Sequence, residues 1–433
     1  MARIAVIGSG ISGLSVAHGL RGLADVTLFE AGDYFGGHTH TVDVTLEGRT
    51  HGVDTGFLVY NERTYPNLIR LFAELGVETA ASDMTFSVQV PDIGLEWSGS
   101  DMNTVFAQRR NLVRPGFLRM LADIVRFNRV TTGIAEREAE EELRQPIGDF
   151  LAAGRFSAEF RDWYFLPMIG CIWSCPTDQM LRFPIATMIR FCHNHGLLQI
   201  TDRPRWFTVA GGARRYVDKM LQGIPDARLR TPVRRVRRVT HASGRQDVLV
   251  STDAGTETYD HVVLACHSDQ ALALLADPSA QETEVLGAIR YQPNLAVLHT
   301  DTSVLPRRRL AWAAWNYERP ECASQEAGVC LHYLLNRLQP LPFTTPVLVS
   351  LNPAREIDPA SVHGRFDYAH PVFDLAAIDA QRRLPCLQGI GGTWYCGAWT
   401  RYGFHEDGLM SGLAVVNAIQ DELSVPDAGR EAA

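Results

Sequence analysis

The sequence predicts a mixed α/β (α+β) fold in which strand, glycine turn and helix follow one another near both ends of the chain. Three observations predict it. The chain opens with a strand, a glycine-rich turn, a helix and a second strand. Its middle holds an alternating hairpin region that ends in a buried-type strand, and near its end a strand, a glycine turn and a helix follow one another again. Strands that alternate with helices are typical of parallel sheets.

The first unit spans Met1–His38. Its apolar run Ile4–Ile7 leads into the turn Gly8–Gly13, which reads GSGISG, and a second apolar run, Val26–Phe29, ends on the acid Glu30. A glycine turn between a strand and a helix leaves backbone N–H groups at the helix N-terminus, where a phosphate can bind.

The residue types in this turn fit a dinucleotide. Gly8 permits the tight turn, Gly10 lets a pyrophosphate approach the backbone, and Gly13 lets the helix pack close to the sheet. Glu30 is placed to accept hydrogen bonds from a ribose, since that acid is expected ~20 residues after the glycines. A glycine-rich turn that binds no nucleotide is the remaining alternative.

The segment after Glu30 continues the glycine pattern. Gly36 and Gly37 leave backbone amides free for a second anionic or ribityl group. Residues 41–46 alternate like a strand, and residues 52–57 predict a further glycine-bearing turn. Residues 66–75 predict a helix that ends at Gly76.

Residues 101–204 differ in character from what precedes them. The stretch 117–130 predicts a helix with one apolar face and one arginine-bearing face, and residues 108–129 hold six arginines against one aspartate. Two interpretations stay open: a solvated helix packed on a core, or a basic amphipathic surface for anionic lipid. Residues 135–144 predict a Glu-rich, solvent-facing helix.

Residues 156–173 and 183–198 are dense in aromatic and apolar side chains, which predicts an apolar cap over a substrate site. The second stretch carries His193 and His195, two residues apart, so they do not share a helix face and do not indicate a metal pair. We expect no metal site.

The middle and C-terminal blocks complete the pattern. Residues 206–212 precede a helix at 214–221, the alternation of 230–238 predicts a strand, and a hairpin turns at residues 253–255 before the buried strand His261–Ala265. The arginines of 230–238 follow from strand alternation and do not indicate nucleic acid. The run Arg307–Arg309 is either solvated or a second contact with lipid headgroups.

The C-terminal block, residues 393–408, contains a strand followed by a glycine turn, and a helix is expected at 409–420. Its N-terminus is a second site for anionic or electron-rich atoms. Glu406 and Asp407 are expected to cap this helix. The tail at residues 424–433 is expected to be disordered.

Composition narrows the class of protein. The chain has 433 residues and a net charge of −8, which argues against nucleic acid as a partner. Its eight cysteines show no CxxC pairs, and no apolar run reaches the ~20 residues of a membrane span. Because the chain opens directly into a strand, we expect no signal peptide and a cytoplasmic protein. Lys219 is the only lysine, hence the only candidate for a catalytic lysine.

Together the three glycine-rich blocks resemble the flavin-containing amine oxidase and phytoene desaturase superfamily. The resemblance covers almost the whole chain and implies FAD as cofactor, bound by a Rossmann-like domain of the amine oxidase type, with an interleaved substrate or cap domain. It places the FAD-binding domain at 1–60, 205–290 and 385–423, and the cap at 61–204 and 291–384. The implied FAD contacts are Gly8, Gly10, Ile11, Ser12, Gly13, Glu30, Ala31, Gly36, Gly37, His38, Thr39, Gly56, Phe57, Val233, Gly397, Ala398, Gly408 and Leu409.

A narrower resemblance rests on residues 36–41, 53–57, 194–198, 397–400 and 403–408. These are similar to bacterial flavoproteins related to the N-terminal half of plant cyclopropane fatty-acid synthases, one branch of which desaturates methyl-branched acyl chains. This resemblance implies a membrane-lipid substrate, a lipid methyltransferase as partner, and peripheral contact with the inner face of the membrane.

Departures from amine oxidases agree with that implication. Amine oxidases usually place a lysine in the strand that here begins near Asn294, and this strand has none. They often carry a tyrosine after the glycine that matches Gly408, where this chain has Leu409. An aliphatic side chain beside the flavin suits an alkyl chain better than an amine.

The expected reaction is hydride transfer from an acyl carbon to the flavin with loss of a neighbouring proton, which leaves a double bond. Candidate catalytic residues are His405, His38, Tyr60 and Glu406, with His193 and His195 more remote. Each of these could instead serve only as a hydrogen-bond partner. Three other functions stay open: an amine or amino-acid oxidase, a flavin-dependent double-bond isomerase, and a scaffold for a lipid methyltransferase.

Overall fold

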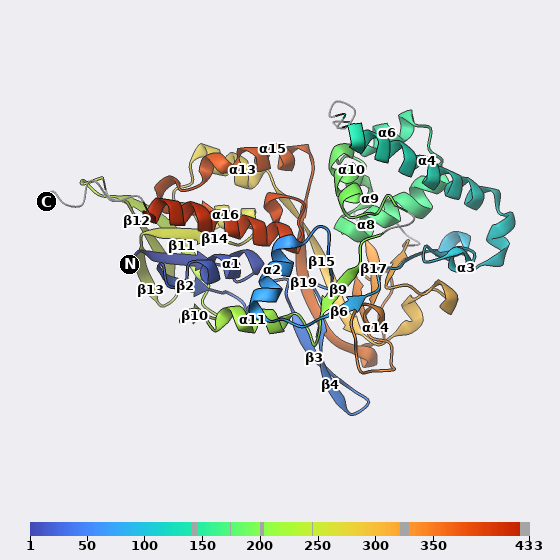
Figure 1. Cartoon of the computed structure of the whole chain (residues 1–433), viewed down its shortest axis with the longest axis horizontal. Helices are drawn as coiled ribbons and strands as arrows, with labels where there is room; N and C mark the ends of the chain where they lie inside the picture. The colour runs from blue at the N-terminus through green and yellow to red at the C-terminus, as the bar shows by residue number, and fades with distance from the viewer. Residues whose placement is uncertain are drawn as a thin grey trace.

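The computed structural model describes residues 1–137, 139, 145–173, 175–199, 203–244, 246–320 and 329–424. Both described ends of the chain lie in one body, on the left in Figure 1, and the helices of residues 102–194 lie at the opposite end of the molecule, beside a large sheet. The predicted mixed α/β class is confirmed.

The first body is built on a five-stranded sheet in which every pairing is parallel. Its strand order is β10-β2-β1-β14-β20. Successive residues of β1 point to opposite faces, so Ile4 and Val6 enter one core while Ala5 and Ile7 enter another. The strands are β1 (Arg3–Ile7), β2 (Asp25–Phe29), β10 (Asp226–Arg228), β14 (His261–Leu264) and β20 (Thr393–Tyr395).

Each face of this sheet is covered. Helices α1 (Ile11–Gly19) and α16 (His405–Ser424) pack together on the first face. The other face carries an antiparallel meander and three helices, whose side chains share one core with the sheet. These elements are β11 (Val233–Thr240), β12 (Gln246–Thr252), β13 (Gly255–Tyr259), α12 (Ser268–Leu274), α13 (Ala280–Gly287) and α15 (Leu375–Arg383).

The second body contains a seven-stranded sheet of order β19-β15-β18-β17-β16-β7-β8, antiparallel except between β16 and β7. Its largest core is shared with the helices of residues 102–194, which supply the predicted apolar layer. The strands are β7 (Phe86–Val90), β8 (Leu95–Ser98), β15 (Arg290–His299), β16 (Trp315–Glu318), β17 (Cys330–Leu334), β18 (Leu348–Leu351) and β19 (Val362–Val372).

The helices beside this sheet are mostly short. A π-helical segment, Arg161–Phe165, joins α7 to α8. The helices are α3 (Met102–Val105), α4 (Pro115–Arg137), α6 (Ile147–Ala153), α7 (Ala158–Phe160), α8 (Leu166–Trp173), α9 (Thr177–Met180), α10 (Ile185–Asn194) and α14 (Leu335–Leu338).

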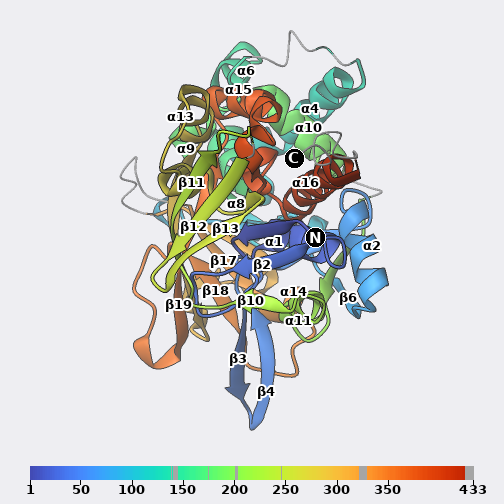
Figure 2. The same cartoon turned by 90° about the vertical axis from the view of Figure 1, so that its left-hand side faces the viewer.

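Two small sheets and two further helices complete the fold, and both helices pack in the core of the first body. Figures 1 and 2 both show the hairpin of β3 (Thr41–Leu46) and β4 (Arg49–Asp54) extending away from the rest of the molecule. The second small sheet has the order β5-β9-β6. Its elements and the helices beside it are β5 (Tyr60–Asn61), β9 (Trp206–Val209), β6 (Thr79–Ser82), α2 (Pro66–Leu75) and α11 (Arg214–Leu221).

Several predicted boundaries differ from the structure. Residues 52–54, predicted as part of a turn, belong to β4, because the hairpin turns earlier, at residues 47–48. Helix α2 falls in the range predicted for the cap but packs against α16 through Leu68, Leu71 and Phe72. The apolar face of α2 therefore packs in the core of the first body.

The predicted helix at 117–130 is α4, which runs longer, from Pro115 to Arg137. Val125, one of the apolar residues of this stretch, is 47% exposed. Most of the Glu-rich helix predicted at 135–144 lies outside the described residues. So does the predicted tail, except Ser424, which is the last residue of α16.

Candidate functional site: a cavity between the two bodies

A cavity of about 850 Å³ lies between the two bodies. It begins at Ile7 and Phe29, the carboxyl ends of β1 and β2, where ligands of open parallel sheets bind. It ends against the seven-stranded sheet and the helices α8 and α10. One continuous space therefore joins the predicted dinucleotide turn to the predicted apolar cap.

The glycines of the first turn have separate structural roles. Gly8 has a φ of +104°, and a Cβ there would lie 2.7 Å from the Ala265 carbonyl oxygen. A Cβ on Gly13 would lie 1.8 Å from the Gly8 carbonyl oxygen, so helix α1 approaches the turn only because this residue is glycine. Gly10 is the N-cap of α1, and a Cβ on it would meet no described atom within 4 Å. The open space in front of Gly10 is part of the cavity.

Glu30 lines the cavity beside this turn. Its carboxylate accepts hydrogen bonds from the Ser9 amide at 3.0 Å, the Ser9 hydroxyl at 2.5 Å and the Gly32 amide at 2.7 Å. These donors hold the carboxylate at the end of β2, beside the turn that leads into the N-terminus of α1. This is the arrangement that a ribose beside a pyrophosphate requires.

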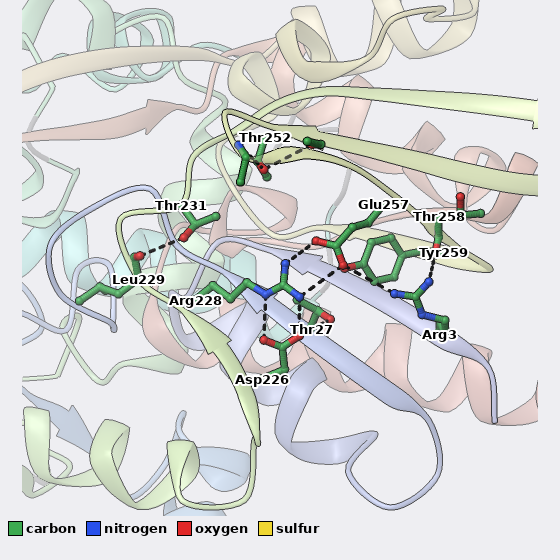
Figure 3. Close-up of polar contacts among 12 residues, drawn as sticks. Arg3, Thr27, Asp226, Arg228, Leu229, Thr231, Thr252, Glu257, Thr258 and Tyr259 are labelled. Atoms are coloured by element: carbon green, nitrogen blue, oxygen red, sulfur yellow. Dashed lines mark hydrogen bonds and ion pairs between the residues drawn. The ribbon is translucent and has the colours of Figure 1, made fainter.

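An ion-pair network, drawn in Figure 3, joins β10 to β13 and contacts β2, the strand that precedes Glu30. Arg228 of β10 pairs with Asp226 and with Glu257 of β13, while Asp226 accepts a hydrogen bond from the Thr27 hydroxyl of β2 at 2.9 Å. The Arg228 guanidinium holds the pKa values of both carboxyl groups below their usual range. The network joins the meander to the sheet edge beside Glu30, whose amide donates to the Arg228 carbonyl oxygen.

Two further glycine positions bring the backbone close to the first turn. Gly36 forms a backbone bridge with Gly10, and a Cβ on Gly37, whose φ is +58°, would lie 3.1 Å from the Gly10 Cα. Gly56 lies against the His38 carbonyl oxygen, where a Cβ would approach to 2.2 Å. The segments 36–38 and 56–57 therefore form one wall of the cavity.

The C-terminal block closes the cavity from the other side. Gly397 and Ala398, two of the FAD contacts that the resemblance implies, line it. A Cβ on Gly408 would lie 2.8 Å from Ile11 Cγ2, and one on Gly412 would lie 2.0 Å from Ser15 Oγ. Helix α16 thus packs directly on α1, and the two chain ends converge on the same space.

Comparison with known proteins agrees with this geometry. A model of the flavin-containing amine oxidoreductase family matches residues 11–315. The chain belongs to this family. FAD is the cofactor that the family implies, and the protein is an FAD-dependent oxidoreductase.

Several solved structures have the same fold as this chain. A putrescine oxidase bound to putrescine has a TM-score of 0.67 at 16% identity, over 97% of this chain and 99% of that one. A cyclohexylamine oxidase from Brevibacterium oxydans has 0.65 at 18%, over 98% and 99%. A CLA-producing fatty acid isomerase from P. acnes has 0.67 at 14%, over 96% and 98%. No curated protein matches the sequence.

The residues of the oxidoreductase fit FAD. The open helix N-terminus at Gly10, the carboxylate of Glu30 and the glycine wall of 36–38 would hold the ADP half. Val233, at the start of β11, also lines this part of the cavity. The part lined by residues 56–57, 397–398 and 403–405 would hold the flavin half.

Three histidines meet where the flavin half would lie. Burial lowers the pKa of His38 to about 3, that of His370 to about 4 and that of His405 to about 3, so all three imidazoles are neutral at physiological pH. His405 stacks on Phe57 at 3.9 Å, and its Nε2 is 2.7 Å from the Tyr216 hydroxyl. The buried Nε2 of His38 has no hydrogen-bond partner among the described residues.

Two of the four candidate catalytic residues do not reach the cavity. Tyr60 packs in the core of the first body against Phe72 and Phe207. Glu406 turns away from the cavity and accepts hydrogen bonds from the amides of Asn67 and Leu68 at 2.9 and 3.0 Å. It therefore caps α2, whereas the sequence predicted that it caps its own helix, which begins four residues earlier than expected.

Several other predicted residues also serve packing. Thr39 and Leu409 are buried beside the cavity without lining it, and so is Gly13. Asp407 accepts a hydrogen bond from the Phe404 amide just ahead of α16. Lys219 donates to the carbonyl oxygens of Leu75 and Gly76 at the end of α2. The one lysine thus caps the C-terminal end of α2 in the first body.

The far end of the cavity is mostly apolar, and six of its lining residues belong to the stretches 156–173 and 183–198, from which the sequence predicted an apolar cap. His195 is one of them, and burial lowers its pKa to about 4. His370 was missed because its place in the cavity depends on the pairing of β19 with β15, where Asn294 Nδ2 contacts its Nδ1 at 2.8 Å. The lining of this end includes Met84, Phe86, Met168, Cys171, Ile172, Phe191, His195, Leu197, Trp206, Trp315, Tyr333 and Phe404.

Proposed function

We propose that the oxidoreductase desaturates an apolar, chain-like substrate, and that this substrate is an acyl chain of a membrane lipid. One observation carries the proposal: among the described residues that line the cavity, Glu30 and Arg234 are the only acidic or basic side chains apart from histidines, and both lie at the ADP end. A buried ammonium group would need a charged partner or an aromatic cage. An alkyl chain needs only apolar walls.

The reaction removes a hydride from one chain carbon and a proton from its neighbour, and leaves a carbon–carbon double bond. FAD, when bound, supplies the hydride acceptor. The apolar walls position the chain and exclude water. His38 is the better candidate for the base, because its Nε2 is unoccupied among the described residues, while the Nε2 of His405 is engaged by Tyr216.

The proposal extends to the acyl chain itself, which we propose to be methyl-branched. A methyl-branched chain would require a lipid methyltransferase to supply the branch, which makes such an enzyme the natural partner. One solved structure with the same fold, at 14% identity, is a fatty acid isomerase, which supports a fatty acyl chain as substrate.

Amine oxidation is the second candidate. Trp315 and Tyr333 line the cavity as an edge-to-face pair, with ring centroids 4.8 Å apart. Aromatic faces can hold a cation. The absence of a described carboxylate at this end still favours the acyl chain.

Mass spectrometry of lipids from cells with and without the protein tests the proposal. We expect an acyl chain that is two mass units lighter when the protein is present, and no change with a His38→Asn variant that retains flavin. Isomerisation predicts an unchanged mass with a moved double bond. Peroxide release from amines, with no lipid change, would establish the amine oxidase instead.

A further inference from the structure

We propose that the end of the second body farthest from the N-terminus docks on the surface of an anionic phospholipid membrane. This surface, here called the distal tip, comprises α3, the 3-10 turn Arg109–Val113, the first turn of α4 and the 3-10 turn Arg309–Ala311 with Arg307 before it. Figure 1 places α3 at the opposite end of the molecule from the N-terminus. The proposal stands independently of the reaction proposed above.

The fold brings together two arginine-bearing stretches that are about 200 residues apart in the chain. The turn Arg309–Ala311 packs against α3. The Arg109 guanidinium in turn donates to the carbonyl oxygen and side chain of Asn103 in α3. Both stretches therefore belong to one surface.

The distal tip exposes large apolar side chains. Val113 is 81% exposed and Met102 is 69% exposed. Isolated apolar side chains on a surface are ordinary, but a group rimmed by arginines marks an interaction site. The group consists of Met102 at 69%, Leu112 at 51%, Val113 at 81%, Leu118 at 43% and Leu310 at 39% exposure.

Arg308 pairs with Glu96 at 3.2 Å, but the other arginines of the distal tip have no acidic partner among the described residues. Among the described residues no carboxylate forms an ion pair with the group Arg109, Arg110, Arg114, Arg307 and Arg309. Arg110 instead donates to the Gly94 carbonyl oxygen, and Arg114 lies over the Trp163 ring. Asp101 is the acid of α3, and its side chain caps that helix. A chain of net charge −8 thus carries a locally positive end.

The middle of α4 does not contribute to this charge. Arg119 pairs with Glu159 at 3.2 Å and Arg126 with Asp123 at 2.8 Å. The proposed surface therefore leaves out Arg119 and Arg126 of the stretch 117–130, for which the sequence left a solvated helix and a lipid-binding surface both open. It lies ahead of that helix and on the neighbouring 3-10 turn.

An anionic membrane fits both features of the distal tip. Arginines near a lipid surface bind its headgroups, and aliphatic side chains between them enter the interface. A nucleic acid would satisfy the arginines but would leave Val113 and Met102 without a contact. Among the described helices none is both long and apolar enough to cross a bilayer, so we propose surface contact.

The test is sedimentation of the FAD-loaded protein with vesicles of inert synthetic lipid. We expect binding to vesicles with 30 mol% phosphatidylglycerol, none to pure phosphatidylcholine, and release by added salt. An arginine near an anionic surface strengthens binding about fivefold, so the double variant Arg307→Ser/Arg309→Ser should bind roughly 25-fold more weakly. The variant Met102→Ser/Val113→Ser should also bind at least tenfold more weakly.

The matched control is Arg237→Ser/Leu375→Ser, which removes one exposed arginine and one exposed leucine from the first body. Its binding should stay within twofold of the wild type, and all variants should retain flavin absorbance. The proposal would be overturned if the wild-type protein did not bind the anionic vesicles, or if the tip variants bound as tightly as the control variant. So would tip variants that lose binding to single-stranded DNA while vesicle binding is unchanged. Because no turnover is measured, these outcomes do not depend on the proposed reaction.

Discussion

The substitution Gly10→Ala separates cofactor binding from folding. The methyl group would meet no described atom within 4 Å, and the φ of −63° suits alanine, so the FAD-free protein should fold normally. Exchanging glycine for alanine at an N-cap costs at most about 1 kcal/mol. The methyl group, however, would stand in the cavity in front of α1, where the pyrophosphate is expected. An extra group in a close contact costs about 1–3 kcal/mol, so FAD should bind roughly 5- to 150-fold more weakly.

Two other glycines provide matched comparisons. The same change at Gly13 would place a Cβ 1.8 Å from the Gly8 carbonyl oxygen, so Gly13→Ala should destabilise the FAD-free protein as well. Gly133, inside α4, would place its Cβ 3.6 Å from the end of the flexible Arg137 side chain. Gly133→Ala should leave FAD affinity unchanged and raise helix stability by up to about 1 kcal/mol.

The assay is titration of FAD into each FAD-free variant, followed by flavin fluorescence, together with thermal unfolding without FAD. The expected order is loss of affinity alone for Gly10→Ala, loss of both for Gly13→Ala and loss of neither for Gly133→Ala. If Gly10→Ala binds FAD within twofold of the wild type, the pyrophosphate does not lie where the turn places it.

Three further predictions concern residues around the cavity. Glu406→Ala should lower the free energy of unfolding by about 2–3 kcal/mol, because the amides of α2 lose their hydrogen-bond acceptor. The control Asp421→Ala, on the exposed end of α16, should change it by less than about 0.5 kcal/mol. Equal effects of the two substitutions in urea denaturation would refute the capping role. Burial lowers the folded pKa of His405 to about 3, so the unfolded chain binds the extra proton below pH ~6.5 and stability falls as pH falls from there towards 3. In His405→Gln the pH dependence of unfolding should be about 1.4 kcal/mol per pH unit shallower in that window, and an unchanged slope would show that His405 does not titrate this way. Lys219→Met should cost about 1–2 kcal/mol in thermal unfolding but leave oxidation intact, and loss of turnover in a well-folded variant would mean that the lysine acts in catalysis.

Local patterns predicted the parts of the site that depend on backbone conformation. The turn 8–13, the acid at 30 and the glycines at 36–37 are predictable because each needs a residue type that few others can replace. The bounds of α2 and α11 also match, because their apolar spacing and end signals are strong.

The remaining features depend on contacts between distant segments. Nothing near Glu406 in the sequence indicates that its carboxylate caps a helix 339 residues away. The pairing of Asn294 with His370 likewise needs the register of two strands. The sequence named residues 108–129 and 307–309 as possible lipid contacts, but it could not show that they lie side by side, because that depends on the packing of the turn Arg309–Ala311 against α3.

Helix α2 is tied to the cavity at its first turn. Its N-cap residue, Tyr65, lines the cavity, and its first amides are held by Glu406, whose chain neighbour His405 lines the same cavity. A ligand that fixes His405 therefore also fixes the acceptor of those amides. Amide hydrogen exchange at Asn67 and Leu68 should then slow when FAD binds, so that the surface helix reports the occupancy of a cavity that its own amides never touch.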